Sequence, residues 1–136
     1  MKFLFDTTVV SDFTRGVPAI LDRVKATPKE DCSISVVTAM EIEYGLKLNL
    51  ERARKIRPRI SAFLKDLQVL AYEIEDANAT AAIRAALRKR GKPIGFYDVM
   101  IAGTALRHGQ TVVTSNVDEF ERIDGLIVED WRNPSS

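Results

Sequence analysis

Short apolar runs alternate with longer helical patterns along this chain, and this alternation limits the fold more than any other feature. Each run is brief, rich in Val, Ile, Leu or Phe, and closed by polar residues, which is typical of buried strands. Strands that alternate with helices predict βαβ units, hence an α/β fold with a central, mainly parallel sheet and helices on both faces. We expect strands at residues 2–5, 32–35, 69–71, 111–114 and 126–128, and helices at residues 17–26, 38–48, 50–67 (with Pro58 as a candidate kink), 74–90 and 97–108.

One domain is expected from the length and the composition. With 136 residues, of which 46% are hydrophobic, the chain can bury a core without disulfides or a structural metal. The only cysteine is Cys32 and the only histidine is His108, which argues against a disulfide or a Cys/His zinc site and favours a reducing, cytoplasmic setting. We interpret Cys32 as a buried strand residue and His108 as the end of a helix. Neither a signal peptide nor a membrane-spanning run is predicted, and residues 133–136 are expected to form a disordered tail.

The distribution of charge favours a polyanionic partner, although the formal net charge is only +1. Residues 47–65 are rich in Lys and Arg with Glu51 as the one opposing acid, and residues 84–92 contain basic residues and no acid. Either segment alone is equally well explained as a solvated helix face. Two basic segments beside an acidic site favour a nucleic acid, whose affinity comes largely from phosphate neutralisation.

Asp6 and Asp98 are the first candidates for a functional site. Asp6 directly follows a predicted strand, and ligands of open parallel sheets bind beyond the carboxyl ends of the strands. Asp6 is also a natural N-cap for a helix that runs through Val9 and Val10. Asp98 shares a helix face with apolar residues at positions 101, 102 and 105, so it lies on the core-facing stripe. A carboxylate there must cap the helix, be paired or bind a cation, because unpaired burial is costly.

Two glutamates lie in the helical pattern at residues 38–48, on nearly opposite helix faces. Periodicity does not choose between Glu41 and Glu43. Glu41 shares its face with the small residues Thr38 and Gly45, which would allow a close approach to the sheet edge, whereas Glu43 would face water. This difference favours Glu41 weakly.

The segment after the predicted strand at residues 111–114 contains Asn116, Asp118 and Glu119. Its structural interpretation is a capping box, with Asn116 as N-cap and Glu119 three residues later. The same turn would place Asn116 and Asp118 over the crevice that holds Asp6. Several acids in one crevice repel each other unless a cation binds them, and an all-oxygen ligand set suits Mg²⁺ or Mn²⁺. Such an ion activates water and neutralises charge on a phosphodiester, so hydrolysis of that bond is the expected chemistry.

Four motifs in order resemble the PIN-domain ribonucleases, and more narrowly the VapC-type toxins of bacterial toxin–antitoxin pairs. They are FDTT at residues 5–8, SVVTAMEIEYG at residues 35–45, GKPIGFYDVMIA at residues 91–102 and VTSNVDEF at residues 113–120. The resemblance runs from the first residue to about Trp131 and implies a three-layer α/β/α PIN nuclease domain over residues 1–132. It also implies a Mg²⁺- or Mn²⁺-dependent endoribonuclease in which water attacks the phosphodiester and leaves a 5′-phosphate and a 3′-hydroxyl.

The resemblance assigns roles to particular residues. It implies metal coordination by Asp6, Glu41 and Asp98, and so selects Glu41 over Glu43. Asn116 matches the position at which many members carry a fourth acid, so either Asp118 helps from nearby or three carboxylates suffice. At position 8 a threonine replaces a frequent asparagine, and its hydroxyl can still orient Asp6 or a bound water.

Substrate and partners are also implied by the resemblance. Residues 91–95 and 125–131 are similar to the toxins that cut initiator tRNA in its anticodon region. The family further implies a homodimer that is silenced by a cognate, VapB-like antitoxin, whose C-terminal segment occupies the active-site groove. Contact with operator DNA would then run only through the antitoxin.

Three other interpretations of the sequence remain. A phosphatase with Asp6 as nucleophile would need another acid two residues later, where Thr8 stands. A dinucleotide-binding fold would need a glycine-rich turn after the first strand. A degenerate domain that binds RNA or protein without cutting is suggested by Asn116 in place of an acid.

Phe96 and Tyr97 are candidates to stack on an RNA base, and we expect one of the two to belong to the core.

Overall fold

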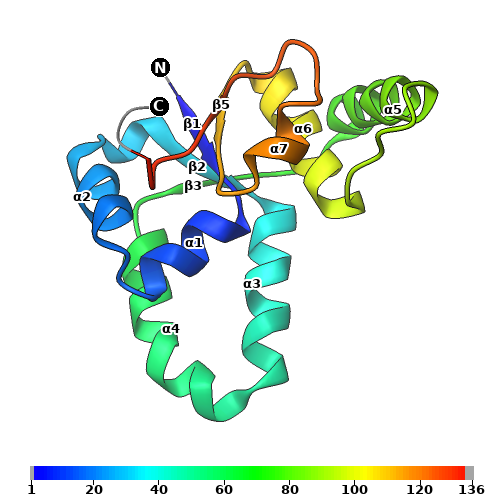
Figure 1. Ribbon diagram of the computed structural model, residues 1–136. Helices are drawn as coiled ribbons and strands as arrows, with labels where there is room; N and C mark the ends of the chain where they lie inside the picture. The colour runs from blue at the N-terminus through cyan, green and yellow to red at the C-terminus, as the bar shows by residue number, and fades with distance from the viewer. Residues whose placement is uncertain (1, 134–136) are drawn as a thin grey trace.

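The computed structural model describes residues 2–133, which form a five-stranded sheet in the order β3-β2-β1-β4-β5 (Figure 1). All four strand pairs are parallel, with Leu4 of the central strand opposite Ser33 on one side and Val112 on the other. The predicted parallel sheet is therefore confirmed, with each strand within about two residues of its expected place. The strands are β1 (Phe3–Phe5), β2 (Cys32–Ser35), β3 (Gln68–Leu70), β4 (Thr111–Val113) and β5 (Val128–Glu129).

Helices cover both faces of the sheet and make the three layers that were expected. One face packs against α1 to α4, through residues such as Phe5, Ile34 and Val113. The other packs against α5 to α7, through residues such as Leu4 and Val112. Successive strand residues thus serve opposite cores, as the period of two requires. The helices are α1 (Thr7–Thr14), α2 (Pro18–Ala26), α3 (Val36–Leu48), α4 (Leu50–Leu64), α5 (Ile74–Lys89), α6 (Phe96–His108) and α7 (Val117–Phe120), with a short 3₁₀ turn at Lys29–Asp31.

Most helix boundaries agree with the sequence. The largest difference is at α4, which ends at Leu64 rather than residue 67, and Pro58 lies inside this helix without ending it. Cys32 is buried in β2 and His108 ends α6, both as predicted. None of the helices in residues 2–133 is long and apolar enough to cross a membrane.

The C-terminal segment closes the core that α1 to α4 share. Trp131 is buried, and its ring makes edge contacts with Phe3 and Phe5 at centroid distances of 5.0 and 5.2 Å. Asn133 donates its backbone N–H to the Asp130 carbonyl at 3.3 Å. The rest of the predicted tail, residues 134–136, lies outside the described residues.

The strand order reverses at the centre of the sheet, and we call the region beyond the carboxyl ends of the strands there the crevice. The chain moves outward from β1 to β2 and β3, and then crosses to β4 on the opposite side of β1. The carboxyl ends of β1 and β4 therefore flank the point where the strand order reverses, which is where open α/β sheets bind ligands. Asp6 follows β1 there, and Asn116 follows β4 three residues after that strand ends.

Candidate active site

Asp6 is the most rigidly held carboxylate of the crevice. It is buried, and it caps α1 by accepting the backbone N–H groups of Thr8 and Val9 at 3.0 and 3.3 Å. The hydroxyls of Thr8 and Thr114 donate to its two different oxygens. Burial raises the pKa of Asp6 to about 6, although all of these hydrogen bonds lower it. Of the two roles that the sequence offered for Asp6, the N-cap is confirmed, and the metal-binding role stays a prediction.

The two threonines also join the ends of β1 and β4. The Thr8 hydroxyl accepts the backbone N–H of Ser115 at 2.9 Å, and the Thr114 hydroxyl accepts that of Asn116 at 2.8 Å. Each hydroxyl thus donates to Asp6 and accepts from the turn after β4. This network fixes Asp6 relative to Asn116, and it confirms that the hydroxyl of Thr8 orients Asp6.

Asp98 lies on the first turn of α6. The N-cap of this helix is Gly95, so Asp98 is not the capping residue. The Asn116 amide donates to Asp98 Oδ2 at 3.3 Å and also to Glu119. The pKa of Asp98 is raised to about 7, first by burial, then by hydrogen bonding with Glu119, and then by the negative charges of Asp6, Glu119 and Glu41. Asp6, Glu41 and Glu119 therefore lie close enough to Asp98 to disfavour its negative charge.

Glu119 is the site residue that sequence reasoning did not find. Its spacing from Asn116 predicted a capping box, but the Asn116 side chain makes no capping bond to α7 and turns to Asp98 and Glu119 instead. Asp118, the acid that the sequence proposed, is exposed. The three-residue spacing was the available signal, because it places Asn116 and Glu119 on the same side of a helical turn.

Glu41 and Glu43 have different surroundings. Glu41 is half-buried and accepts a hydrogen bond from the Thr7 hydroxyl at 2.7 Å. Glu43 is exposed and pairs with Lys47 and Arg57 at 3.6 and 3.1 Å, and the hydrogen bond from Arg57 lowers the pKa of Glu43. Glu41 is therefore the glutamate that faces the crevice. The close approach expected at Gly45 is not seen, since an added Cβ would meet no atom within 4 Å.

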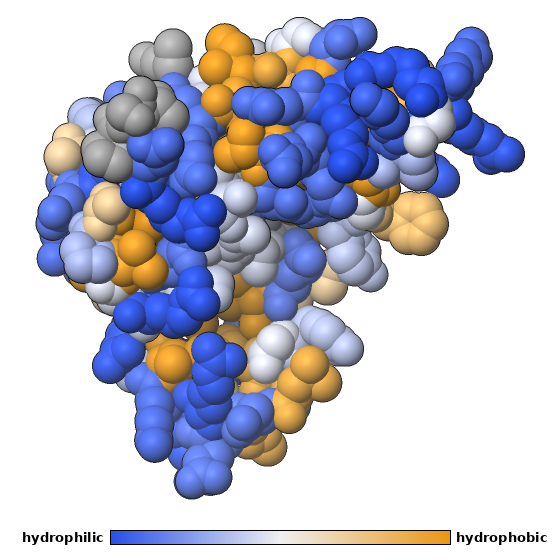
Figure 2. Space-filling view, in the orientation of Figure 1, coloured by the Kyte–Doolittle hydropathy of each residue, from blue (hydrophilic) through white to orange (hydrophobic). Residues whose placement is uncertain are grey.

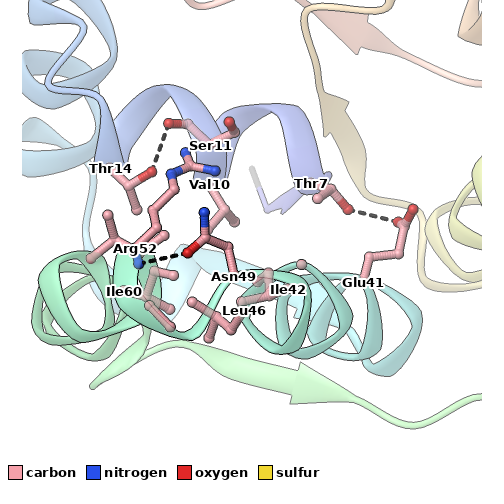
Figure 3. Close-up of a pocket in the computed structure, with 13 residues that line it drawn as sticks. Thr7, Val10, Ser11, Thr14, Glu41, Ile42, Leu46, Asn49, Arg52 and Ile60 are labelled. Atoms are coloured by element: carbon pink, nitrogen blue, oxygen red, sulfur yellow. Dashed lines mark hydrogen bonds between the residues drawn. The ribbon is translucent and has the colours of Figure 1, made fainter.

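A groove of about 130 Å³ runs from Glu41 between α1, α3 and α4. Figure 3 shows Thr7 and Glu41 at one end, with Thr14 and Arg52 toward the other. The walls between them are mostly apolar and include Val10, Ile42, Leu46 and Ile60. The basic segment at residues 47–65 contains the end of α3 and all of α4, and its Arg52 brings a positive charge into this groove.

Phe96 and Tyr97 correct one expectation from the sequence. Both are exposed, with 72% and 50% of their surface accessible, so neither belongs to the core. They occupy the first turn of α6, and the buried face of that helix begins only at Val99. The two rings are therefore available at the surface, directly before Asp98.

The crevice fits a hard divalent cation by the chemistry of its donors. Asp6, Glu41, Asp98 and Glu119 offer only oxygen, and a bound cation would relieve the repulsion that raises the pKa of Asp98. As the side chains stand, no three acid, His or Cys side chains among residues 2–133 converge into a ligand set. Glu41 is held by Thr7 and Asp98 by Asn116, so a cation would compete with these partners for the same oxygens.

Comparison with known proteins gives a consistent result. A sequence model of the PIN domain matches residues 3–126. The chain is 39% identical to the tRNA(fMet)-specific endonuclease VapC of Salmonella typhimurium, over 96% of this chain and 98% of that protein. It is 34% identical to the ribonuclease VapC2 of Haemophilus influenzae, again over 96% and 98% of the two chains. The crystal structure of DNA-bound VapBC from Salmonella typhimurium contains a chain that superposes with a TM-score of 0.87 at 39% identity, covering 96% of this chain and 98% of that one.

Proposed function

Because this chain belongs to the PIN-domain family and, within it, to the VapC ribonucleases, we propose that its crevice cuts RNA internally with the help of Mg²⁺ or Mn²⁺. The observation that carries the proposal is the gathering of Asp6, Glu41 and Asp98 at the reversal point of the sheet, with pKa values of about 6 for Asp6 and about 7 for Asp98. Burial disfavours the ionised forms of Asp6 and Asp98, and at Asp98 neighbouring negative charges add to this, so a divalent cation would stabilise both carboxylates.

In this proposal Asp6, Glu41 and Asp98 hold the ion, and Glu119 supplies the fourth acid from beside Asn116. When bound, such an ion activates water and neutralises charge that develops on the phosphodiester. The protein's own part is to keep the carboxylates in place. Thr8 and Thr114 fix Asp6, Thr7 fixes Glu41, and the Asn116 amide holds Asp98. No side chain is required as a nucleophile.

The substrate that we propose is initiator tRNA, cut in the anticodon region to leave a 5′-phosphate and a 3′-hydroxyl. The proposal is supported by the name of the Salmonella typhimurium relative, a tRNA(fMet)-specific endonuclease at 39% identity. It is also supported by the basic C-terminal half of α5, where the exposed Arg84 and Arg88 line a pocket together with Phe96 at the start of α6. Positive side chains there can hold the phosphates on either side of the bond that is cut.

The direct test is cleavage of purified initiator tRNA in Mg²⁺ or Mn²⁺ by the wild type and by Asp6→Ala, Glu41→Ala and Asp98→Ala. Each variant should lose about a hundredfold or more in rate, since each removes a ligand of the ion. Glu43→Ala is the matched control and should cut like the wild type, because Glu43 is paired at the surface. Full activity of Asp98→Ala, or cleavage that survives exhaustive chelation, would contradict the proposal.

The alternative of a non-cutting RNA- or protein-binding module is separated from this one by metal titration. An ion that binds only the folded chain raises its melting temperature by mass action. We expect millimolar Mn²⁺ to stabilise the wild type and to have a much smaller effect on Asp98→Ala. An unchanged melting temperature of the wild type, together with RNA binding that leaves the RNA intact, would support the binding module.

We also propose a homodimer and a VapB-like antitoxin as partner, with operator DNA reached only through the antitoxin. The support for the antitoxin is the DNA-bound VapBC assembly that contains the similar Salmonella typhimurium chain. The groove beside Glu41, with apolar walls and Arg52, suits an inhibitory peptide segment.

The homodimer is supported by an exposed apolar stripe on α3, made by Val36, Met40 and Tyr44, which is suited to contact a second copy. Sedimentation of the purified chain, alone and with the candidate antitoxin, tests both partners.

A further inference from the structure

We propose that a pocket beside the start of α6 binds one unpaired base of the RNA, stacked on Phe96, with the adjoining phosphate held by Arg84 and Arg88. This inference rests on the proposed function and names a part of the substrate that the catalytic carboxylates do not contact. The pocket lies between the C-terminal half of α5 and the segment that leads into α6. None of the crevice carboxylates lines it.

The size and the walls of the pocket suit a partly apolar group. Its volume is about 450 Å³. Leu87 and Val99, both buried, and the half-buried Ile94 contribute apolar surface to it. Phe96 stands at the pocket with 72% of its surface exposed, so its ring is accessible to a ligand in the pocket. Exposed rings of this kind are the platforms on which proteins stack unpaired bases.

The charges around the ring select the ligand. The Arg84 guanidinium lies over the Phe96 ring, with Cζ 5.4 Å from the centroid. Within residues 2–133, neither Arg84 nor Arg88 forms an ion pair with an acid, and no acidic residue lines the pocket. Figure 2 shows that the surface over α5 is strongly hydrophilic. Two unneutralised cations beside an exposed ring complement a base and its phosphate, whereas an apolar protein segment would leave both cations without counter-charge.

The pocket is continuous with the active site through the backbone of residues 95–99. A Cβ added at Gly95 would lie 3.7 Å from Asp98 Oδ2, so the backbone just before Phe96 adjoins the crevice carboxylate. Phe96 and Val99, which both line the pocket, bracket Asp98 along the chain. Because Phe96 and Asp98 are two residues apart on α6, their side chains point to different sides of the helix. The pocket therefore holds a part of the strand beside the bond that is cut, and not the bond itself.

The pocket also predicts a preference for unpaired RNA. A base within an A-form duplex has both faces stacked and its edges paired, so it cannot lie on Phe96 without leaving the helix. A loop or single-stranded segment offers such a base at little cost. We infer that the pocket discriminates between loops and stems of a folded RNA, and that it acts on binding rather than on the bond-breaking step.

The test is the affinity for a short fluorescent single-stranded RNA, measured by anisotropy in EDTA so that no cutting occurs. Phe96→Ala should weaken binding about tenfold, because stacking is lost, whereas Phe96→Tyr should bind like the wild type. Arg88→Gln should weaken binding and lower the salt dependence by about one phosphate contact. The matched controls are Ile127→Ala, an exposed apolar residue elsewhere, and Lys25→Gln on α2; both should bind within about twofold of the wild type.

Three results would overturn the inference. They are wild-type affinity of Phe96→Ala, equal losses in Phe96→Ala and Phe96→Tyr, and a change of oligomeric state on sedimentation of Phe96→Ala, which would assign the ring to contact with a second copy. In cleavage assays Phe96→Ala should raise KM about tenfold and leave kcat unchanged. Because the binding assay does not depend on cutting, a wild type that binds but does not cleave would refute the proposed function while the affinity ratios still decide this inference.

Discussion

At the scale of single residues, the crevice is defined by how each carboxylate is restrained. Asp6 is fixed by two threonine hydroxyls and two backbone N–H groups, whereas Asp98 has one amide, from Asn116, at 3.3 Å. Glu119 shares that amide and raises the pKa of Asp98. Asp6 is therefore a rigid part of the site, and the pair of Asp98 and Glu119 is the part whose protonation responds to its surroundings.

Replacing each of the two neighbouring acids of α7 by alanine tests whether Glu119, and not Asp118, acts on Asp98. Glu119→Ala should lower the rate of RNA cleavage about 10- to 100-fold and should lower the pKa of Asp98, because a hydrogen bond and a like charge are both removed. Asp118→Ala is the control and should change neither, since Asp118 is exposed. Cleavage assays and carboxyl titration by NMR make the comparison, and a larger loss in Asp118→Ala would reverse the roles given to these acids.

At the scale of elements, α5 and α6 are the most closely packed pair of helices, and α6 carries Asp98. A Cβ at Gly103 would lie 2.2 Å from the Thr80 hydroxyl and 3.1 Å from backbone atoms of α5, so only glycine allows this approach. Arg107 of α6 also pairs with the buried Asp76 of α5. The position of Asp98 relative to the sheet thus depends on contacts far from the crevice.

A matched pair of glycine variants tests the importance of this contact. Gly103→Ala should lower the free energy of unfolding by about 1–3 kcal/mol, because the helices must separate. Gly45→Ala on α3 should instead raise it by about 0.5–1 kcal/mol, since no atom lies within 4 Å and alanine favours the helix. Urea denaturation measures both values. Equal effects of the two substitutions would show that the α5–α6 approach is not tight.

At the scale of the whole molecule, the acidic crevice makes stability depend on pH when no metal is present. The pKa of Asp6 is raised from 3.8 to about 6 in the folded chain, so the folded state holds this proton more tightly than the unfolded state. The free energy of unfolding should therefore fall as the pH rises from about 4 through about 6. For Asp6 the loss is about 3 kcal/mol, and Asp98 acts in the same direction up to about pH 7.

Denaturation of metal-free protein across pH 4–8 checks this expectation. Asp6→Asn should reduce the downward slope between pH 4 and 6, because an amide does not titrate there. Millimolar Mn²⁺ at about pH 7 should recover stability in the wild type, as a bound cation favours the ionised carboxylates. A slope that is identical in Asp6→Asn and the wild type would contradict the shifted pKa of Asp6.

The candidate site shows where inference from the sequence reached its limit. Asp6 and Asp98 were found from their places after a strand and on an apolar helix face, and both lie in the crevice. The choice of Glu41 over Glu43 needed the family resemblance, because the two residues differ in their side-chain partners and not in their local pattern. Glu41 accepts a hydrogen bond from Thr7, whereas Glu43 pairs with Lys47 and Arg57. The spacing of Asn116 and Glu119 predicted a capping box, but the Asn116 side chain makes no capping bond and its backbone N–H is taken by the Thr114 hydroxyl, 2.8 Å away.

The sequence alone determined the alternation of strands and helices, the parallel sheet and the acids at strand ends, because these follow from local periodicity and from where an apolar run stops. Only the tertiary structure decided which carboxylates share a crevice, that Glu119 rather than Asp118 reaches Asp98, and that both Phe96 and Tyr97 are exposed. These outcomes depend on the crossover that places β4 beside β1 and on the packing of α6 against the sheet. Such contacts join residues about a hundred positions apart, as in the hydrogen bond from Thr114 to Asp6, and no local pattern specifies them.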